Sequence, residues 1–136
     1  MAECYHEDAV FSDPVFENLK GSQITDMWSL LCLQAKTLEI KYSNIQADET
    51  SGQASWTARY PFGKSHREVF NRIEAKFEFL DGKIIRHIDH FDMWKWCRMA
   101  LGPLGFFMGW HSVVQVNIRR QAMKNLTNFT SKRKTT

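Results

Sequence analysis

The sequence predicts an α+β fold in which a curved antiparallel sheet packs against helices. Residues Arg67–Leu80 alternate apolar and polar side chains, which is typical of a strand with one packed and one solvated face. Residues Gln23–Lys36 instead place apolar side chains three and four positions apart, as an amphipathic helix does. The pair Asp81-Gly82 marks a tight turn into the next apolar stretch. Strands joined by such turns pair antiparallel, and a helix then covers one face of the sheet.

Length and composition favour one domain with an ordinary core. The chain has 136 residues, of which 43% are hydrophobic, 24% charged and 13% aromatic. Its net charge is only +3, and much of this excess lies in Lys132–Lys134, which we expect to form a frayed, solvated tail. We therefore predict a single domain over residues 1–130, a basic tail over residues 131–136, and no nucleic-acid partner.

The cysteines point to a reducing compartment. Cys4, Cys32 and Cys97 are odd in number and unrelated in spacing, so they form neither a disulfide framework nor a metal-binding C-x-x-C pair. The first residues, MAECYHED, are polar and acidic, unlike a signal peptide. We expect a cytoplasmic protein.

One uncharged stretch, Met99–Ile118, is long enough to raise the question of a membrane span. Gly102 and Pro103 interrupt it, and His111 and Gln115 add polar groups, which argues against a spanning helix. We expect a buried or oligomer-facing segment and no membrane partner.

Several further elements follow from periodicity. A short strand, Ala9–Phe16, ends in a turn at Pro14, where regular pairing cannot continue. Alternation resumes at Thr37 and shifts phase after Asn44, which indicates a bulge. The remaining predicted elements are strands at Gln53–Phe62 and Lys83–Asp92, a helix at Met93–Leu101, and an amphipathic helix that ends near Phe129.

The last strand carries most of the titratable side chains that could support chemistry. Alternation places His87 and Asp89 on one face, between apolar neighbours, and His90 on the other. A buried imidazole and carboxylate can act as an acid–base pair near neutral pH. An ion pair on the solvated face, or a polar strand end, explains the same pattern. Asp92 is better placed to cap the next helix.

Asp13 is a second candidate. An Asp before Pro14 commonly forms a turn, but its position between Phe11 and Phe16 also suits a weakly solvated base. No metal site is predicted, since His90 points away from His87 and no third ligand is placed. The sequence also lacks a phosphate-binding glycine loop and any motif that positions a Ser or Cys nucleophile.

Two segments resemble the SnoaL-like, nuclear-transport-factor-2-like superfamily. They are YHEDAVFSDPVF, followed by Gly21 and an apolar helix, and DGKIIRHIDHFD; the segment DMWKWCRMALGPLGFFMGWH is similar to one bacterial subgroup. The resemblance implies a conical α+β barrel with cystatin-like topology and a deep apolar cavity. Members include ketosteroid isomerases, polyketide cyclases, epoxide hydrolases and non-enzymatic binding domains. Of the long N-terminal helix of the family we expect only one turn, at Met1–Tyr5, and we therefore expect no counterpart of its catalytic Tyr.

The resemblance also implies roles for the candidate residues. Asp13 stands at the position of the isomerase general base, and Asp89 matches an acid–base Asp of the cyclases, with His87 beside it. We expect a homodimer that needs no cofactor and binds a small apolar ligand. A non-catalytic binding or dimerisation module explains the same resemblance. We expect the ligand to contact Phe16, Trp28, Trp56, Tyr60, Asn71, Ile73 and Phe91.

Without the family's first helix, the cavity is expected to lie partly open. We predict that the segment Met99–Phe129, or a partner subunit, covers it.

Overall fold

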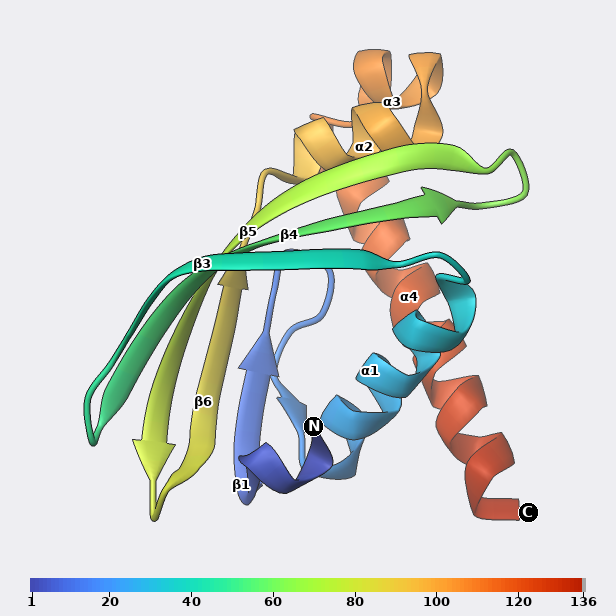
Figure 1. Cartoon of the computed structure of the whole chain (residues 1–136). Coiled ribbons are helices and arrows are strands. Elements are labelled where there is room, and N and C mark those ends of the chain that lie inside the picture. The colour runs from blue at the N-terminus through green and yellow to red at the C-terminus, as the bar shows by residue number, and fades with distance from the viewer. Residues whose placement is uncertain (136) are drawn as a thin grey trace.

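The computed structural model describes residues 1–135 and shows a six-stranded, strongly bent sheet with helices against its concave side (Figure 1). The strands lie in the order β2-β1-β6-β5-β4-β3, and every neighbouring pair is antiparallel except β1 and β6. The elements are η1 (Ala2–Cys4), β1 (Tyr5–Ser12), β2 (Leu19–Lys20), α1 (Ser22–Gln34), β3 (Glu39–Ala47), β4 (Ser51–Phe62), β5 (Arg67–Leu80), β6 (Lys83–His90), α2 (Met93–Leu101), α3 (Pro103–Met108) and α4 (Ser112–Thr135). The predicted α+β class is confirmed, although the sheet does not close into a barrel.

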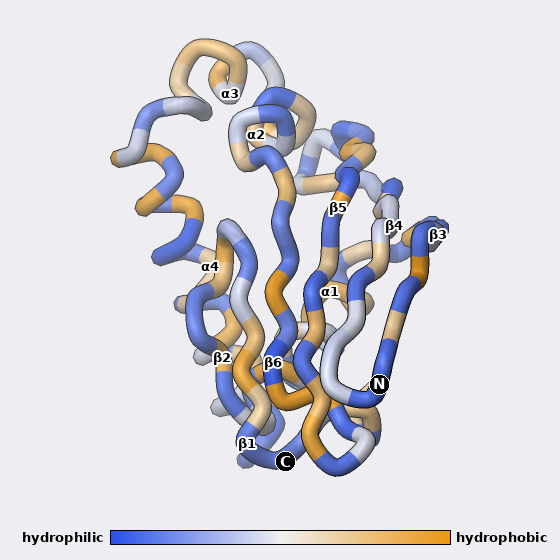
Figure 2. The backbone as a smooth tube through the Cα atoms, turned by 90° about the vertical axis from the view of Figure 1, so that its left-hand side faces the viewer, coloured by the Kyte–Doolittle hydropathy of each residue, from blue (hydrophilic) through white to orange (hydrophobic). Residues whose placement is uncertain are grey.

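The long strand β5 is the spine of the sheet. It pairs with β4 from Arg67 to Glu78, but with β6 only from Glu74 to Leu80. Helix α2 packs beside the remaining half of β5, where the Arg67 side chain donates to the Met99 carbonyl at 3.0 Å. Figure 2 shows hydrophobic and hydrophilic residues alternating along these strands. This alternation gives the sheet one apolar and one polar face.

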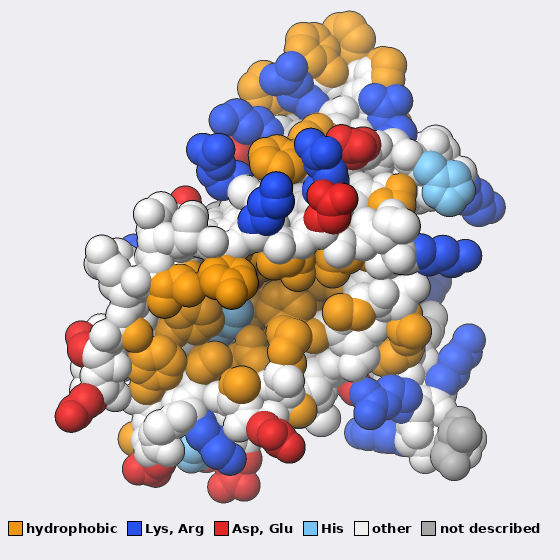
Figure 3. Space-filling model, viewed as in Figure 1, with side chains coloured by type: hydrophobic (Ala, Val, Ile, Leu, Met, Phe, Trp, Pro, Cys, Tyr) orange, Lys and Arg blue, Asp and Glu red, His pale blue; other side chains and the backbone are white. Residues whose placement is uncertain are grey.

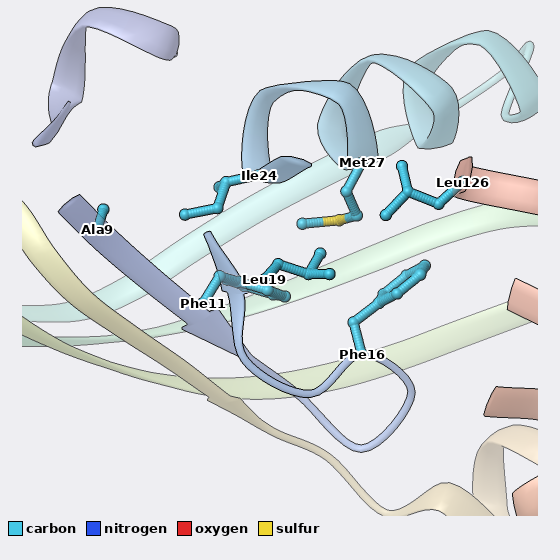
Figure 4. Close-up of a cluster of buried hydrophobic side chains, with 7 residues drawn as sticks. All are labelled: Ala9, Phe11, Phe16, Leu19, Ile24, Met27 and Leu126. Carbon is cyan, nitrogen blue, oxygen red and sulfur yellow. The ribbon is translucent and has the colours of Figure 1, made fainter. Parts of the chain in front are cut away.

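Two apolar clusters hold the helices on the concave side. One joins β1, α1 and α4 through buried side chains, and Figure 4 shows Met27 of α1 between Leu126 of α4 and the strand residues. The other packs Val69 of β5 against Trp96 and Cys97 of α2. Each fully buried large side chain contributes roughly 1.5–3 kcal/mol.

A polar contact also ties α1 to the end of α4. The buried carboxylate of Asp26 accepts from the hydroxyl of Thr130 at 2.8 Å and from the guanidinium of Arg133 at 2.6 Å. The expected frayed tail is therefore wrong as far as Thr135, because residues 131–135 continue α4 and Arg133 binds a buried acid.

Other boundaries differ from expectation for physical reasons. Strand β1 begins at Tyr5 and ends at Ser12, because it pairs in parallel with a strand far along the chain. Helix α3 is absent from the predicted elements, which treat Gly102 and Pro103 only as an interruption. Pro103 in fact occupies the first turn of α3, where proline is favoured. The short strand β2 was not predicted. The bounds of β5 and α2 are confirmed, as are the Asp92 cap on Lys95 N–H and the irregularity after Ser43.

None of the helices within residues 1–135 is long and apolar enough to cross a membrane.

Candidate active site

Strand register brings the candidate residues onto one concave surface. Residues paired directly across neighbouring strands share a face, and His87 pairs with both Phe77 and Phe11. The other pairs on this face are Ala75 with Asp89, Ile73 with Trp56, Asn71 with Ala58, and Trp56 with Tyr42. Figure 3 shows hydrophobic side chains lining a hollow on this side of the molecule, with a histidine at its floor.

The His87–Asp89 pair lies at the centre of this surface. His87 is 6% exposed and Asp89 is 3% exposed, and His87 Nε2 lies 2.8 Å from Asp89 Oδ1. Aromatic rings surround the imidazole, with centroids 4.4 Å away for Phe77, 4.9 Å for Phe11 and 6.2 Å for Trp28. The solvated ion pair considered from sequence is therefore wrong, because the pair is buried.

Tyr5 and Trp28 extend this pair into a chain of hydrogen bonds. The indole of Trp28 donates to the Tyr5 hydroxyl at 3.1 Å, and Tyr5 Oη lies 2.8 Å from His87 Nδ1. An indole can only donate, so the Tyr5 hydroxyl proton is free to point at Nδ1. Both ring nitrogens of His87 therefore have a partner, Tyr5 at Nδ1 and Asp89 at Nε2.

Burial raises the pKa of Tyr5 to about 12, and the nearby Asp89 carboxylate adds to the rise. The hydrogen bond from Trp28 opposes it. The phenol therefore stays protonated across the physiological range.

Asp13 follows β1 and combines the two roles considered from sequence, a turn former and a weakly solvated base. Its Oδ1 accepts from the backbone N–H groups of Val15 at 2.7 Å and Phe16 at 2.6 Å, which builds the turn around Pro14. Burial nevertheless raises its pKa from 3.8 to about 6, against the lowering effect of these two bonds. Asp89 raises this pKa further and His87 lowers it, so the three predicted residues form one electrostatic group.

The second carboxylate oxygen of Asp13, Oδ2, makes no hydrogen bond to any residue within 1–135. Asn71 is also without a side-chain partner in this part of the chain, although only 8% of it is exposed. Tyr60 accepts from the Trp96 indole at 2.9 Å, which leaves its own hydroxyl proton to donate elsewhere. Burial raises the pKa of Tyr60, and Asp13 contributes electrostatically to that rise.

The other residues expected to contact a ligand divide into two groups. Ile73, Trp28 and Trp56 lie on the concave surface, with the two indoles 6.3 Å apart. Phe16 is buried inside the cluster of β1, α1 and α4. Phe91 is partly buried, packs against the cluster around α2 and lines a groove between β5 and α2. Within residues 1–135, no group of three or more His, Cys, Asp or Glu side chains could hold a metal ion.

Tyr5 is the site residue that sequence reasoning missed. Met1–Tyr5 was assigned to a helix end, whereas Tyr5 is the first residue of β1. The available signal was its odd-numbered position in the strand, which it shares with the inward-facing Ala9 and Phe11. Two charged residues, Glu7 and Asp8, hide that alternation.

The expected cover of the hollow by residues 99–129 is only partly observed. Ile118 packs against the cluster at α2, Leu126 fills the core beside Met27, and Arg119 donates to the Pro14 carbonyl at 2.7 Å. Phe107 and Trp110, in contrast, point into solvent. The hollow remains open on the face seen in Figure 3.

Residues 1–87 match the family model of the SnoaL-like domain. The chain belongs to this family. No curated protein matches it. Among solved structures, a protein with a ketosteroid-isomerase-like fold from Catenulispora acidiphila, in complex with trimethylamine, is similar with a TM-score of 0.66 and 8% identity, over 75% of this chain and 80% of that one.

Two other structures show the same fold with different assigned activities. A proposed SnoaL-like polyketide cyclase from Jannaschia sp. CCS1 has a TM-score of 0.63 and 14% identity, over 74% of this chain and 76% of that one. An LEH-like epoxide hydrolase from M. tuberculosis has a TM-score of 0.56 and 24% identity, over 76% of each chain. At these identities the SnoaL-like chain shares a fold with them, and the fold alone does not assign an activity.

Proposed function

We propose that this SnoaL-like protein catalyses proton transfer on an apolar cyclic carbonyl ligand bound in the hollow, in the manner of ketosteroid isomerases and polyketide cyclases. The observation that carries the proposal is Asp13, a half-buried carboxylate with a pKa of about 6 and one oxygen that is left without a partner and open to the hollow. A general base works best when its pKa lies near the working pH. The apolar walls around Trp28 and Trp56 suit a flat ring system.

In the proposed reaction, Asp13 Oδ2 takes a proton from the carbon next to the ligand carbonyl. The electron pair of the broken C–H bond forms a double bond to the carbonyl carbon, and the π electrons of the carbonyl move onto its oxygen. The proton then returns from Asp13 to a carbon of the same ligand, and the carbonyl is restored. Asn71 and Tyr60 are placed to donate hydrogen bonds to the developing oxyanion, because each retains an unused donor on the inward face.

The His87–Asp89 pair serves a different purpose from the direct acid considered from sequence. Both ring nitrogens of His87 are bonded within the protein, so the imidazole has no free donor for a ligand. His87 instead orients Asp89, whose charge adds to the rise in the pKa of Asp13 that burial mainly causes. His87 and Asp89 are therefore proposed as positioning residues.

The same saturation of His87 supports a second candidate function, a non-catalytic ligand-binding module. The ring nitrogens of His87 have hydrogen-bond partners without a ligand, as in a structural network. In that case the hollow binds an apolar molecule and Asp13 only forms its turn.

A deuterium-exchange experiment distinguishes the enzyme from the non-catalytic binding module. Steroid enones, tetralones and aromatic polyketides are first tested for raising the melting temperature. The ligands that do so are incubated with the protein in D₂O, and exchange next to the carbonyl is followed by NMR. We expect exchange that rises with pH through about 6 and falls at least about 100-fold in Asp13→Asn.

Asp48→Asn is the matched control, because Asp48 makes the same turn from an exposed position. Binding with no exchange, or with exchange that Asp13→Asn leaves unchanged, overturns the enzyme and supports the module. A panel with no melting shift overturns both candidates.

We further propose a cytoplasmic homodimer, in keeping with free thiols at Cys4, Cys32 and Cys97. Light scattering of the full chain measures the subunit count directly.

A further inference from the structure

The apex of the molecule carries a patch of exposed apolar side chains. Helix α3 stands above α2 at the end farthest from the β5–β6 turn (Figure 1), and the space-filling view shows hydrophobic side chains capping this tip (Figure 3). Phe107 is 71% exposed and Trp110 is 66% exposed. The members of this apical patch are Leu104, Phe106, Phe107, Met108, Trp110, Val113 and Val116. Large apolar side chains gathered on a protruding surface mark an interaction site.

The outward direction of these side chains is enforced by glycine. Gly105 and Gly109 are both buried and lie one helical turn apart. A Cβ on Gly109 would lie 2.6 Å from Cys97 Cβ, and one on Gly105 would collide with the Cys97 backbone. Only glycine therefore allows α3 to sit this close to α2. The glycine face turns inward, so the large residues between and beside the glycines must face solvent.

The charge of the chain is divided sharply at Asp92. Residues 93–136 contain eight Lys and Arg and no Asp or Glu, whereas all fifteen acids lie in residues 1–92. Acids and bases are thus interspersed only in residues 1–92. Lys95 and Arg98 of α2 and Arg120 of α4 are exposed on the two helices that flank the apical patch. Figure 3 shows Lys and Arg side chains directly below the apolar tip.

Arg98 links the two features. Its guanidinium lies 5.2 Å from the ring centroid of Phe106, a member of the apical patch, and 4.8 Å from that of Trp94. This stacking holds a cation at the edge of the apolar surface.

A groove of about 1270 Å³ begins beside Phe106 and runs between β5 and α2. Its basic residues are Arg67, Arg72, Lys95 and Arg98. Its three acids have other contacts: Glu68 pairs with Arg59 at 3.6 Å, Glu74 accepts from Ser55 at 2.6 Å, and Asp92 caps α2. The basic residues of the groove thus outnumber its acids by four to three, and Arg98 lies where the groove meets the apical patch.

We propose that the apical patch docks this protein onto the surface of an anionic lipid bilayer. Trp, Phe, Leu and Met side chains enter the interface between headgroups and acyl chains, while the flanking Lys and Arg contact the anionic headgroups. The sequence argues only against a helix that spans the membrane. Docking on the membrane surface does not require such a helix.

Two other occupants fit less well. Nucleic acid binding uses cations and stacking, but leaves aliphatic residues such as Leu104 and Val113 in water. A second copy docked through the same patch would bring the cations of the two copies together.

Vesicle sedimentation tests the proposal. The full chain is mixed with vesicles of phosphatidylcholine alone, or of phosphatidylcholine with about one third phosphatidylserine. We expect sedimentation with the anionic vesicles only, lost at high salt. The double variant Phe107→Ser, Trp110→Ser should reduce binding more than about tenfold. Lys95→Gln and Arg120→Gln should each weaken binding by about fivefold, the effect expected for one cation near an anionic surface.

Leu33→Ser with Ile45→Ser is the matched control, because these side chains are 67% and 61% exposed but lie outside the apical patch. It should sediment like the wild type. Equal loss in both double variants overturns the proposal. So does binding to a short DNA duplex in place of vesicles, or a dimer that the Phe107 and Trp110 variant converts to a monomer that never sediments. Circular dichroism melts confirm that each variant is folded.

Discussion

The chain builds the same Asp turn twice, once facing the hollow and once in open solvent. Oδ1 of Asp13 accepts from the backbone N–H groups two and three residues on, and Oδ1 of Asp48 does the same with Thr50 at 2.8 Å and Ser51 at 2.7 Å. The pKa values of the two carboxyl groups nevertheless shift in opposite directions. The pKa of Asp13 rises to about 6, while hydrogen bonding lowers that of Asp48 to about 2.

The difference shows that burial, rather than hydrogen bonding, makes Asp13 a candidate base. Asp48 is fully exposed and accepts two further bonds from the hydroxyls of Thr50 and Ser51. The same contrast recurs for other residue types. His87 is buried and His90 exposed on one strand, and Tyr5 faces the hollow while Tyr42 is 73% exposed. Each of these buried or half-buried residues thus has an exposed counterpart that serves as its control.

The largest expected effect is the loss of His87. In His87→Leu, the Asp89 carboxylate remains buried without its partner, and the Tyr5 hydroxyl loses its acceptor. Removing one member of a buried polar pair costs about 3–5 kcal/mol of unfolding free energy. Urea denaturation measures this cost, and His90→Leu should change stability by no more than about 0.5 kcal/mol. Similar losses in the two variants would mean that His87 is not the anchor of this network.

The next effect is a pH dependence that belongs to Asp13. The folded protein holds the Asp13 proton more tightly than the unfolded chain, because burial raises the folded pKa from 3.8 to about 6. Stability from this group is therefore present at low pH and is lost as pH rises through about 6. Asp13→Asn removes this loss. As pH rises from about 3.5 to about 7, the unfolding free energy of the variant should therefore increase by about 3 kcal/mol relative to that of the wild type.

Asp48→Asn should change the pH dependence of stability in the opposite direction. The folded pKa of Asp48 is lowered, so its contribution is present above the unfolded value and is lost as pH falls toward about 2. Replacing Asp48 should therefore reduce stability at neutral pH relative to acid. Unfolding curves for both variants across the pH range test the contrast. A difference between Asp13→Asn and wild type that stays constant with pH would contradict the burial of its charge.

How much of this site was visible in the sequence depends on the range of the interactions. Strand alternation was enough to place His87 and Asp89 on one face, because side-chain direction is a local property of a strand. The turn at Asp13 was also local, since Pro14 forces it. Whether that face was buried required the helix α1 and its Trp28, which pack against it from elsewhere in the chain.

Tyr5 lay beyond such reasoning because its partner is 82 residues away. At Tyr5, β1 pairs only with β6, and the local alternation around Tyr5 does not reveal that partner. Helix α3 was missed for the opposite reason. Its signal was local, but Gly102-Pro103 was taken as the end of one helix, when proline in the first turn also begins the next.

A smaller stability effect is expected for Tyr5→Phe. The variant keeps the ring but removes the hydroxyl, which leaves the Trp28 indole without an acceptor and His87 Nδ1 without a donor. An unsatisfied buried group costs about 1–3 kcal/mol, so the loss should be about 2 kcal/mol. Tyr42→Phe should be neutral. If Tyr5→Phe is also neutral in urea unfolding, the hydrogen-bond chain contributes no net stability.

The smallest stability effect belongs to Asn71, whose carboxamide has no partner within residues 1–135 despite its burial. Asn71→Leu breaks no internal hydrogen bond, so its unfolding free energy should change by less than about 1 kcal/mol, in either direction. Its effect on a ligand should be larger. A ligand that raises the wild-type melting temperature through a carbonyl group should bind Asn71→Leu about tenfold more weakly, because one hydrogen bond to the ligand is lost. Isothermal titration measures this change. Equal affinity in the two proteins would mean that Asn71 faces the ligand without binding it, and the donor for the oxyanion would then have to be Tyr60 alone.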